Sequence, residues 1–130
     1  MSVELTMLAW SAALLLVLVL IQGAAGVQAQ GMVLAGPRDH LPPPGVFQAR
    51  TKRVVDNHRE GLTIFAPLIL IAALAHLSNH WTLLGAELFF WSRLVHAVLY
   101  LLGVPWIRPL FWVVGLVGTV MVLAAVVGVG

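Results

Sequence analysis

The sequence contains no cysteine. A chain without thiols cannot form a disulfide, cannot bind a metal ion through thiolate ligands and has no sulfur nucleophile of its own. Any sulfur chemistry would therefore have to come from a bound molecule.

Charged residues are also scarce, since they make up only 9% of the 130 residues whereas hydrophobic residues make up 61%. The mean hydropathy of +1.00 lies well outside the range of an ordinary soluble domain. The chain has seven basic and five acidic residues, and some of the basic residues lie in or beside apolar runs. We therefore expect a membrane protein without a nucleic-acid partner.

The apolar residues fall into four runs, at about Leu5 to Ala25, Leu62 to Leu77, Leu83 to Leu102 and Trp106 to Val129. Each is close to the roughly 20 residues that cross a ~30 Å hydrocarbon core. The second run is short, but its helix can begin upstream, near Val46. We predict a single all-α membrane domain over residues 1–130, with four transmembrane helices at about 5–28, 47–77, 82–102 and 106–129.

The first run could instead be a cleaved signal peptide, because a small-residue cleavage site is loosely matched after it. No positive region precedes it, however, Glu4 is acidic, and the run exceeds the usual 7 to 15 residues of a signal peptide. We expect it to be retained as the first helix.

Five of the seven basic residues lie between the first two runs: Arg38, Arg50, Lys52, Arg53 and Arg59. The positive-inside rule places this 30–59 loop in the cytoplasm and both termini outside. The link at Gly103 to Pro105 returns to the same side and brings Arg108 to the level of the loop. The loop also contains Gly36-Pro37-Arg38-Asp39 and Pro42-Pro43-Pro44-Gly45, which cannot continue a helix. It is either a linker or a lid over a ligand.

A polar stripe precedes the second apolar run and consists of Arg50, Arg53, Asn57 and Glu60. Steps of three, four and three residues keep these side chains within roughly an 80° arc of a helix. Charges at the edge of hydrocarbon usually face a bundle interior, a cavity or a ligand. The stripe therefore predicts that this helix face is turned toward the bundle interior, a cavity or a ligand.

A second stripe, Arg93, His96 and Tyr100, lies on one face of the third helix. Arg93 is about ten residues from the helix end, or roughly 15 Å into the membrane. We expect an ion pair between Arg93 and Glu60 on the adjacent antiparallel helix, with Glu87 as the rival carboxylate. His96 is expected to position a ligand rather than to act as a general base.

Positive charge remains at Arg50, Arg53 and Arg108 after this pairing. These arginines either extend toward lipid phosphates or bind an anionic ligand. A ligand with two carboxylates would suit the guanidinium forks. His76 and His80 are four residues apart with no carboxylate beside them, so we expect no metal site.

Two spaced motifs resemble the MAPEG superfamily, the membrane-associated proteins in eicosanoid and glutathione metabolism. The first is Arg50-x-x-Arg53-x-x-x-Asn57-x-x-Glu60 followed by Phe65-Ala66-Pro67-Leu68, which is similar to the second helix of the family. The second runs from Arg93 through His96 to Tyr100, then Pro105 and Arg108, and is similar to the third helix and following turn, especially of the prostaglandin E synthase branch. Gly36-Pro37-Arg38-Asp39 looks like the first loop of bacterial members.

The resemblance implies a homotrimer of four-helix protomers, with glutathione as the cofactor bound between neighbouring protomers at the cytoplasmic side. It implies that Arg108 stabilises the glutathione thiolate, so that Arg108 is the candidate catalytic residue. The candidate glutathione-binding residues are Arg38, Arg50, Arg53, Asn57, Glu60, Arg93, His96 and Tyr100. Asp56, Gly61 and Pro109 depart from the family pattern; the prostaglandin branch has a serine where Pro109 stands.

The resulting hypothesis is a glutathione-dependent transferase or peroxidase of the bacterial inner membrane that acts on lipophilic electrophiles or lipid hydroperoxides. One alternative is a non-catalytic membrane trimer that binds an anionic lipid or another small anion. Another is a small multidrug exporter, which would need a carboxylate in the middle of its first span. Glu4 lies at the extreme end of that span, which disfavours the exporter.

Overall fold

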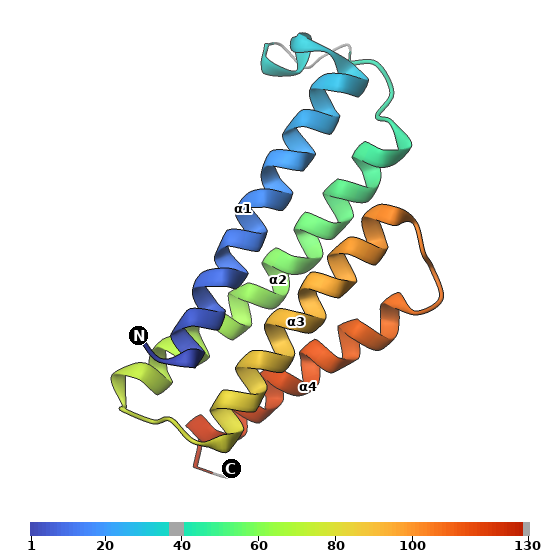
Figure 1. Cartoon of the computed structure of the whole chain (residues 1–130). Coiled ribbons are helices and arrows are strands. Elements are labelled where there is room, and N and C mark those ends of the chain that lie inside the picture. The colour runs from blue at the N-terminus through green and yellow to red at the C-terminus, as the bar shows by residue number, and fades with distance from the viewer. Residues whose placement is uncertain (37–40, 129–130) are drawn as a thin grey trace.

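The computed structural model describes residues 1–36 and 41–128, and these ranges form four α-helices and one short 3-10 helix. The elements are α1 (Val3–Gln30), η1 (Met32–Ala35), α2 (Val46–Leu74), α3 (His80–Leu102) and α4 (Arg108–Val126). The helices pack side by side, with the α2–α3 connection at the same end as the start of α1 and the end of α4 (Figure 1). The prediction of an all-α membrane protein formed by a four-helix bundle is confirmed.

Most helix boundaries differ from the predicted spans by one to three residues, and two of these differences have a local cause. The second helix ends at Leu74 instead of continuing to Leu77, because His76 has a φ of 53° and the Leu77 N–H turns back to the Ala72 carbonyl at 2.8 Å. This is the left-handed helix end that usually carries glycine. The fourth helix begins at Arg108 rather than Trp106, and Pro109 fits its first turn because the first N–H groups of a helix need no helical acceptor.

Three helices, α1, α3 and α4, are long and apolar enough to cross a membrane. The remaining helix, α2, is the longest, but its first half carries the charged residues. Large apolar side chains are exposed along the bundle, for example Trp10, Leu16 and Leu20 on α1. Such exposure is unfavourable in water and ordinary in lipid, so the fold is that of an integral membrane protein.

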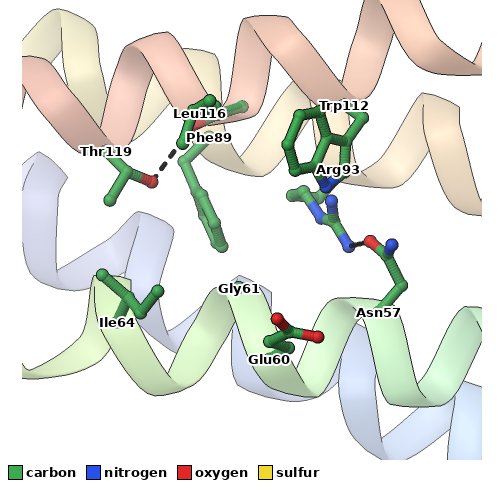
Figure 2. A pocket seen from close by; sticks show the side chains of 10 residues that line it. Asn57, Glu60, Gly61, Ile64, Phe89, Arg93, Trp112, Leu116 and Thr119 are labelled. Atoms are coloured by element: carbon green, nitrogen blue, oxygen red, sulfur yellow. Dashed lines mark hydrogen bonds between the residues drawn. The ribbon is translucent and has the colours of Figure 1, made fainter.

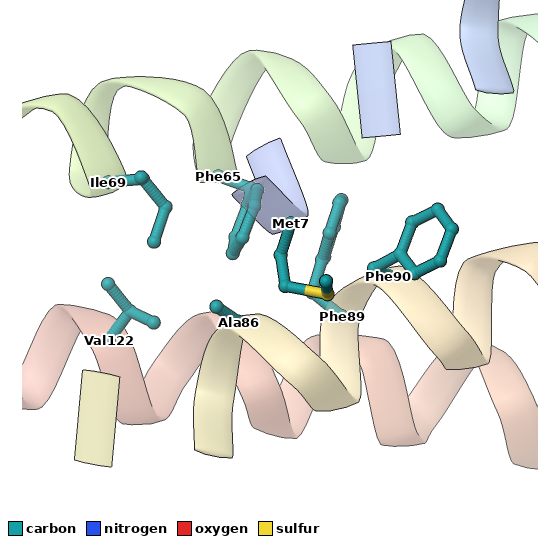
Figure 3. Close-up of a cluster of buried hydrophobic side chains, with 7 residues drawn as sticks. All are labelled: Met7, Phe65, Ile69, Ala86, Phe89, Phe90 and Val122. Carbon is teal, nitrogen blue, oxygen red and sulfur yellow. The ribbon is translucent and has the colours of Figure 1, made fainter. Parts of the chain in front are cut away.

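All four helices contribute to the main hydrophobic core (Figure 3). Its central contact is the stack of Phe65 from α2 on Phe89 from α3, with ring centroids 3.9 Å apart and planes 9° from parallel. A second cluster, made of Leu18, Val54, Val55 and Ala97, joins only α1, α2 and α3. The fourth helix is thus absent from the second cluster, and polar side chains gather where α4 faces α2 and α3.

The connection between α2 and α3 follows from local chemistry. Asn79 ends the turn and accepts hydrogen bonds at Oδ1 from the N–H groups of Trp81 (2.9 Å) and Thr82 (3.1 Å). The Thr82 hydroxyl accepts from the Asn79 N–H at 2.9 Å, which completes a reciprocal cap. The short turn makes α2 and α3 antiparallel neighbours, as the sequence predicts.

Candidate functional site

Three helices meet around the only tyrosine of the chain, at the end of the bundle that we call the arginine end because Arg50, Arg53 and Arg108 lie there. The Arg108 Cζ atom, at the start of α4, lies 4.2 Å from the centroid of the Tyr100 ring on α3. The Arg53 Cζ atom, on α2, lies 5.8 Å from the same centroid. Both guanidinium groups therefore lie over one electron-rich ring, an arrangement that stabilises cations without neutralising them.

A hollow of about 290 Å³ opens beside this cluster, and we call it the outer hollow. It is lined by Asn57, His96, Tyr100, Pro105, Arg108, Pro109 and Trp112. The His96 side chain is buried, and its ring centroid lies 5.7 Å from that of Tyr100. The described residues that line the outer hollow include no carboxylate and one arginine, Arg108, so the charge of this lining is positive.

A second hollow of about 240 Å³, the inner hollow, lies between α2 and the α3–α4 pair. Its lining consists of Asn57, Glu60, Gly61, Ile64, Phe89, Arg93, Trp112, Gly115, Leu116 and Thr119. Figure 2 shows Asn57 and Glu60 on one side, with Arg93 and Trp112 opposite them. Asn57 and Trp112 line both hollows, so the two adjoin and form one cleft with a charged mouth and an apolar interior.

Arg93 is the deepest cation of the cleft, with only 4% of its surface exposed. One of its terminal nitrogens, Nη2, donates a hydrogen bond to Asn57 Oδ1, and its buried Nε has no hydrogen-bond partner among residues 1–36 and 41–128. The side chain passes close to Gly115 on α4, where an added Cβ would lie 3.2 Å from Arg93 Cδ and 2.9 Å from Ser92 Oγ. The absence of a side chain at Gly115 therefore makes room for the arginine.

The predicted ion pair between Arg93 and Glu60 is wrong, because within the described residues Glu60 forms no ion pair with any base. Glu60 is exposed at the rim of the inner hollow, and the neutral amide of Asn57 takes the buried contact instead. A carboxylate in that contact would lose its hydration, which costs more than desolvating an amide oxygen. Arg93 consequently has no carboxylate partner among the residues that the structure describes.

Asp56, a departure from the family pattern, does not enter the cleft. It pairs with Lys52 at 2.7 Å and with Arg59 at 2.5 Å on the exposed side of α2. Asp56 thus shares its one negative charge between the two bases, and this group lies away from the hollows. In the part of the chain that the structure describes, Glu60 is the only carboxylate that lines the two hollows. The guanidinium groups of Arg93 and Arg108 line them as well, and Arg53 lies beside them.

One candidate residue, Arg50, stands apart from the cleft. The Arg50 guanidinium packs against Gly103, the αL residue that ends α3, where an added Cβ would be 3.0 Å from Arg50 Cζ. There it complements the negative end of the α3 dipole, and it lines neither hollow. Arg38 lies outside the described residues.

The connection that carries Arg38 is anchored by two glutamines. Gln30, at the end of α1, donates to the Pro42 carbonyl at 2.7 Å and accepts at Oε1 from the Gln48 side chain at 2.7 Å. Gln48 also accepts from the Gly45 N–H at 3.1 Å. These hydrogen bonds fix the last residues of the connection at the arginine end.

Several residues of the cleft were not predicted from the sequence. They are Gly61, Ile64, Phe89, Trp112, Gly115, Leu116 and Thr119. A signal was present in α4, because Trp112, Gly115 and Thr119 follow Arg108 at helical steps of four, three and four and so share its face. The same argument extends the stripe of α2 to Ile64.

The comparisons with known proteins agree with the motifs. A family model described as MAPEG family matches residues 7–128 of the chain. No curated protein sequence gives a match. No solved structure gives one either.

Proposed function

Because the chain belongs to the MAPEG family, we propose that it is a membrane enzyme that uses glutathione against lipophilic electrophiles or lipid hydroperoxides. The observation that carries this proposal is the cleft itself. A buried arginine without a carboxylate partner and two arginines over Tyr100 lie next to an apolar interior. The cleft thus suits an anionic, hydrophilic molecule at its mouth and a lipophilic molecule in its interior.

Glutathione has two carboxylates, one ammonium and one thiol, and the polar residues of the cleft suit these groups. Arg53, Arg93 and Asn57 are the donors available for the carboxylates, and Glu60 is the acceptor available for the ammonium. The unpartnered Nε of Arg93 supports this assignment, because a buried donor without an acceptor is costly. His96 and Tyr100 position the peptide from α3.

Arg108 is the proposed catalytic residue. It combines a guanidinium group with the N-terminus of α4, and both favour negative charge. A thiol with an ordinary pKa of about 8.5 becomes largely ionised at neutral pH beside such a cation. Glutathione then supplies a sulfur nucleophile, which the cysteine-free chain lacks.

The two reactions balance as follows. In conjugation, the glutathione sulfur forms a bond to the electrophilic carbon and the leaving group departs with the bonding electron pair. In the peroxidase reaction, two glutathione thiols supply two electrons and become one disulfide, while one hydroperoxide becomes one alcohol and one water. The apolar side chains Ile64, Phe89 and Leu116 would hold the lipophilic partner.

We further propose a homotrimer in a bacterial inner membrane, with the arginine end and the 30–59 loop in the cytoplasm and both termini outside. The basic residues of the α1–α2 connection and of α2 support this orientation. In this orientation glutathione reaches the cleft from the cytoplasm, and the lipophilic substrate reaches it from the bilayer.

The proposal is tested by titrating the purified protein with glutathione in a calorimeter and by assaying turnover of a generic electrophile and of a lipid hydroperoxide. We expect saturable binding and turnover in the wild type and a loss of turnover of about 100-fold or more in Arg108→Ala, as when one preorganised donor is removed from a reacting anion. Arg59→Ala is the matched control, because it removes a guanidinium paired with Asp56 outside the cleft.

The alternative is a non-catalytic trimer that binds an anionic lipid or another small anion, which the exposed position of Arg53 favours. Saturable glutathione binding without turnover of either substrate would support this binder. Absence of glutathione binding would exclude the enzyme as proposed.

A further inference from the structure

A carboxylate is buried at the end of the bundle opposite the arginines. Glu4, in the first turn of α1, has only 5% of its surface exposed. Within residues 1–36 and 41–128 it forms no ion pair with a lysine, arginine or histidine. Its burial needs compensation from another source, because a buried charge without a partner is strongly unfavourable.

The neighbouring Thr82 hydroxyl cannot provide that compensation alone. Thr82 Oγ1 lies 3.0 Å from Glu4 Oε2 and also 3.0 Å from the Asn79 carbonyl oxygen. A hydroxyl carries one proton, so it donates to only one of these two acceptors at a time. The described chain offers no hydrogen bond to Glu4 Oε1.

A hollow of about 160 Å³ lies against this carboxylate, equal to roughly five water volumes. Its polar lining is Ser2, Glu4, His76 and Ser78, and its apolar lining is Leu5, Ile69, Ala72, Ala73 and Leu77. His76 adopts a left-handed conformation, with a φ of 53°, directly after α2. The negative end of the α2 dipole and the positive end of the α1 dipole both border this hollow, so Glu4 provides its negative charge.

The residues that line this hollow suit some kinds of cation better than others. A magnesium or calcium ion requires six or more oxygen ligands, and the described residues contain no group of three or more histidine or acidic side chains that could hold a metal ion. A guanidinium group binds best through both carboxylate oxygens, but Glu4 Oε2 is already engaged by Thr82. A primary ammonium on a short carbon chain needs one carboxylate oxygen, a hydroxyl acceptor and an apolar wall, which this hollow provides.

We propose that this hollow, which we call the Glu4 hollow, binds a primary ammonium group through Glu4, with Ser2 or Ser78 as a second acceptor. The site is independent of the glutathione cleft. Two sources share this chemistry at a membrane surface: the headgroup of an aminophospholipid such as phosphatidylethanolamine, and a small free amine.

The first experiment compares melting temperatures in lipid nanodiscs made of phosphatidylcholine alone or of a mixture with phosphatidylethanolamine. We expect the ethanolamine lipid to raise the melting temperature of the wild type by a few degrees, because a ligand that binds only the folded state stabilises it. Glu4→Gln keeps an acceptor for Thr82 but removes the charge, so it should lose this shift. Glu87→Gln, which makes the same change on α3 outside the Glu4 hollow, should keep it.

The second experiment titrates ethanolamine and choline into the wild-type protein in detergent and needs no variant. Ethanolamine has N–H donors and choline has none, so only ethanolamine should raise the melting temperature if the Glu4 hollow also takes free amines. A response to the lipid but not to ethanolamine assigns the site to the headgroup. Equal shifts in wild type and Glu4→Gln, or no wild-type response to either amine source, would overturn the proposal.

Discussion

At the scale of the residue, the contact between Arg93 and Asn57 determines the charge of the cleft. A carboxylate partner would have cancelled the guanidinium charge, whereas the Asn57 amide holds the side chain and leaves the charge available. Under the proposed function, this buried cation is available to the anionic ligand, while its hydrogen bond to Asn57 holds it in place.

Substitutions of Asn57 test this interpretation. Asn57→Asp should leave the protein folded but lower glutathione affinity by about tenfold, or roughly 1.4 kcal/mol, because it places a negative charge beside Arg93. Asn57→Ala should instead lower the free energy of unfolding by about 1–3 kcal/mol, because it leaves a buried donor unpaired. Calorimetric titration and thermal unfolding measure the two effects.

The control for Asn57→Asp is Gln28→Glu, which adds a negative charge to an exposed position of α1 outside both hollows. Wild-type glutathione affinity in Asn57→Asp, or an equal loss in both variants, would contradict a specific role of the Arg93 charge.

Gly103 provides a second test at this scale. Gly103→Ala should lower the free energy of unfolding by about 1–2 kcal/mol, because its φ is +77° and the new Cβ would lie 3.0 Å from the Arg50 guanidinium. Gly23→Ala in α1, where an added Cβ meets nothing within 4 Å, should be neutral or slightly stabilising. Thermal unfolding in detergent compares them, and equal melting temperatures would show that the αL end of α3 contributes nothing.

The sequence predicted which polar residues share a helix face better than it predicted their partners. The periodicity of Arg53, Asn57 and Glu60 is local, so the shared face of α2 could be derived from spacing. The choice between Asn57 and Glu60 as the acceptor for Arg93 is not local. It depends on the cost of desolvating a carboxylate and on the space that Gly115 on α4 leaves for Arg93. Neither can be derived from the sequence of a single helix.

At the scale of the element, α3 and α4 approach each other closely at two glycines, Gly85 and Gly118. A Cβ on Gly85 would lie 2.6 Å from the Gly118 carbonyl oxygen, and a Cβ on Gly118 would lie 2.5 Å from the Gly85 carbonyl oxygen. Backbone cannot move aside as a flexible side chain can. Small residues allow such close helix contacts in membranes, where packing rather than water drives association.

Alanine at either glycine should separate the two helices and lower the melting temperature markedly, with a loss of about 2 kcal/mol or more as in other overpacked cores. Gly61→Ala in α2 is the matched control, because its nearest contact would be Phe89 Cε2 at an ordinary 3.6 Å. A melting temperature for Gly85→Ala or Gly118→Ala at or above that of Gly61→Ala would show that α3 and α4 are not closely packed at these two glycines.

Part of the cleft was not predicted from the sequence, and Trp112 of α4 shows why. Trp112 resembles an interfacial anchor in the sequence, because tryptophan is common where membrane helices end. Its role as the wall shared by both hollows becomes visible only once α4 is placed against α2 and α3. The stripe through Arg108 and Trp112 was present, but an almost uniformly apolar helix gives no contrast by which to choose a face.

At the scale of the whole molecule, the two ends of the bundle differ in chemistry. Basic residues gather at the arginine end, whereas the α2–α3 connection lies at the other end with the start of α1 (Figure 1). The positive-inside rule then predicts which end faces the cytoplasm. The absence of cysteine makes this orientation easy to test.

Single cysteines should report the orientation in intact cells treated with a membrane-impermeant maleimide. We expect Ser78→Cys, in the exposed α2–α3 connection, to be labelled. Gly36→Cys, in the exposed part of the α1–α2 connection, should be labelled only after the cells are opened. The reverse pattern would invert the proposed topology, and the parent chain serves as the unlabelled control.

The inner hollow is walled by Ile64 and Leu116, whose side chains are 57% and 46% exposed on the outer surface of the bundle. A lipophile that reaches the cleft past such a wall is drawn from the bilayer, where its relevant concentration is its mole fraction among lipids. Apparent Michaelis constants for that partner then rise as inert detergent or lipid is added at constant bulk concentration, while those for the water-soluble partner stay unchanged.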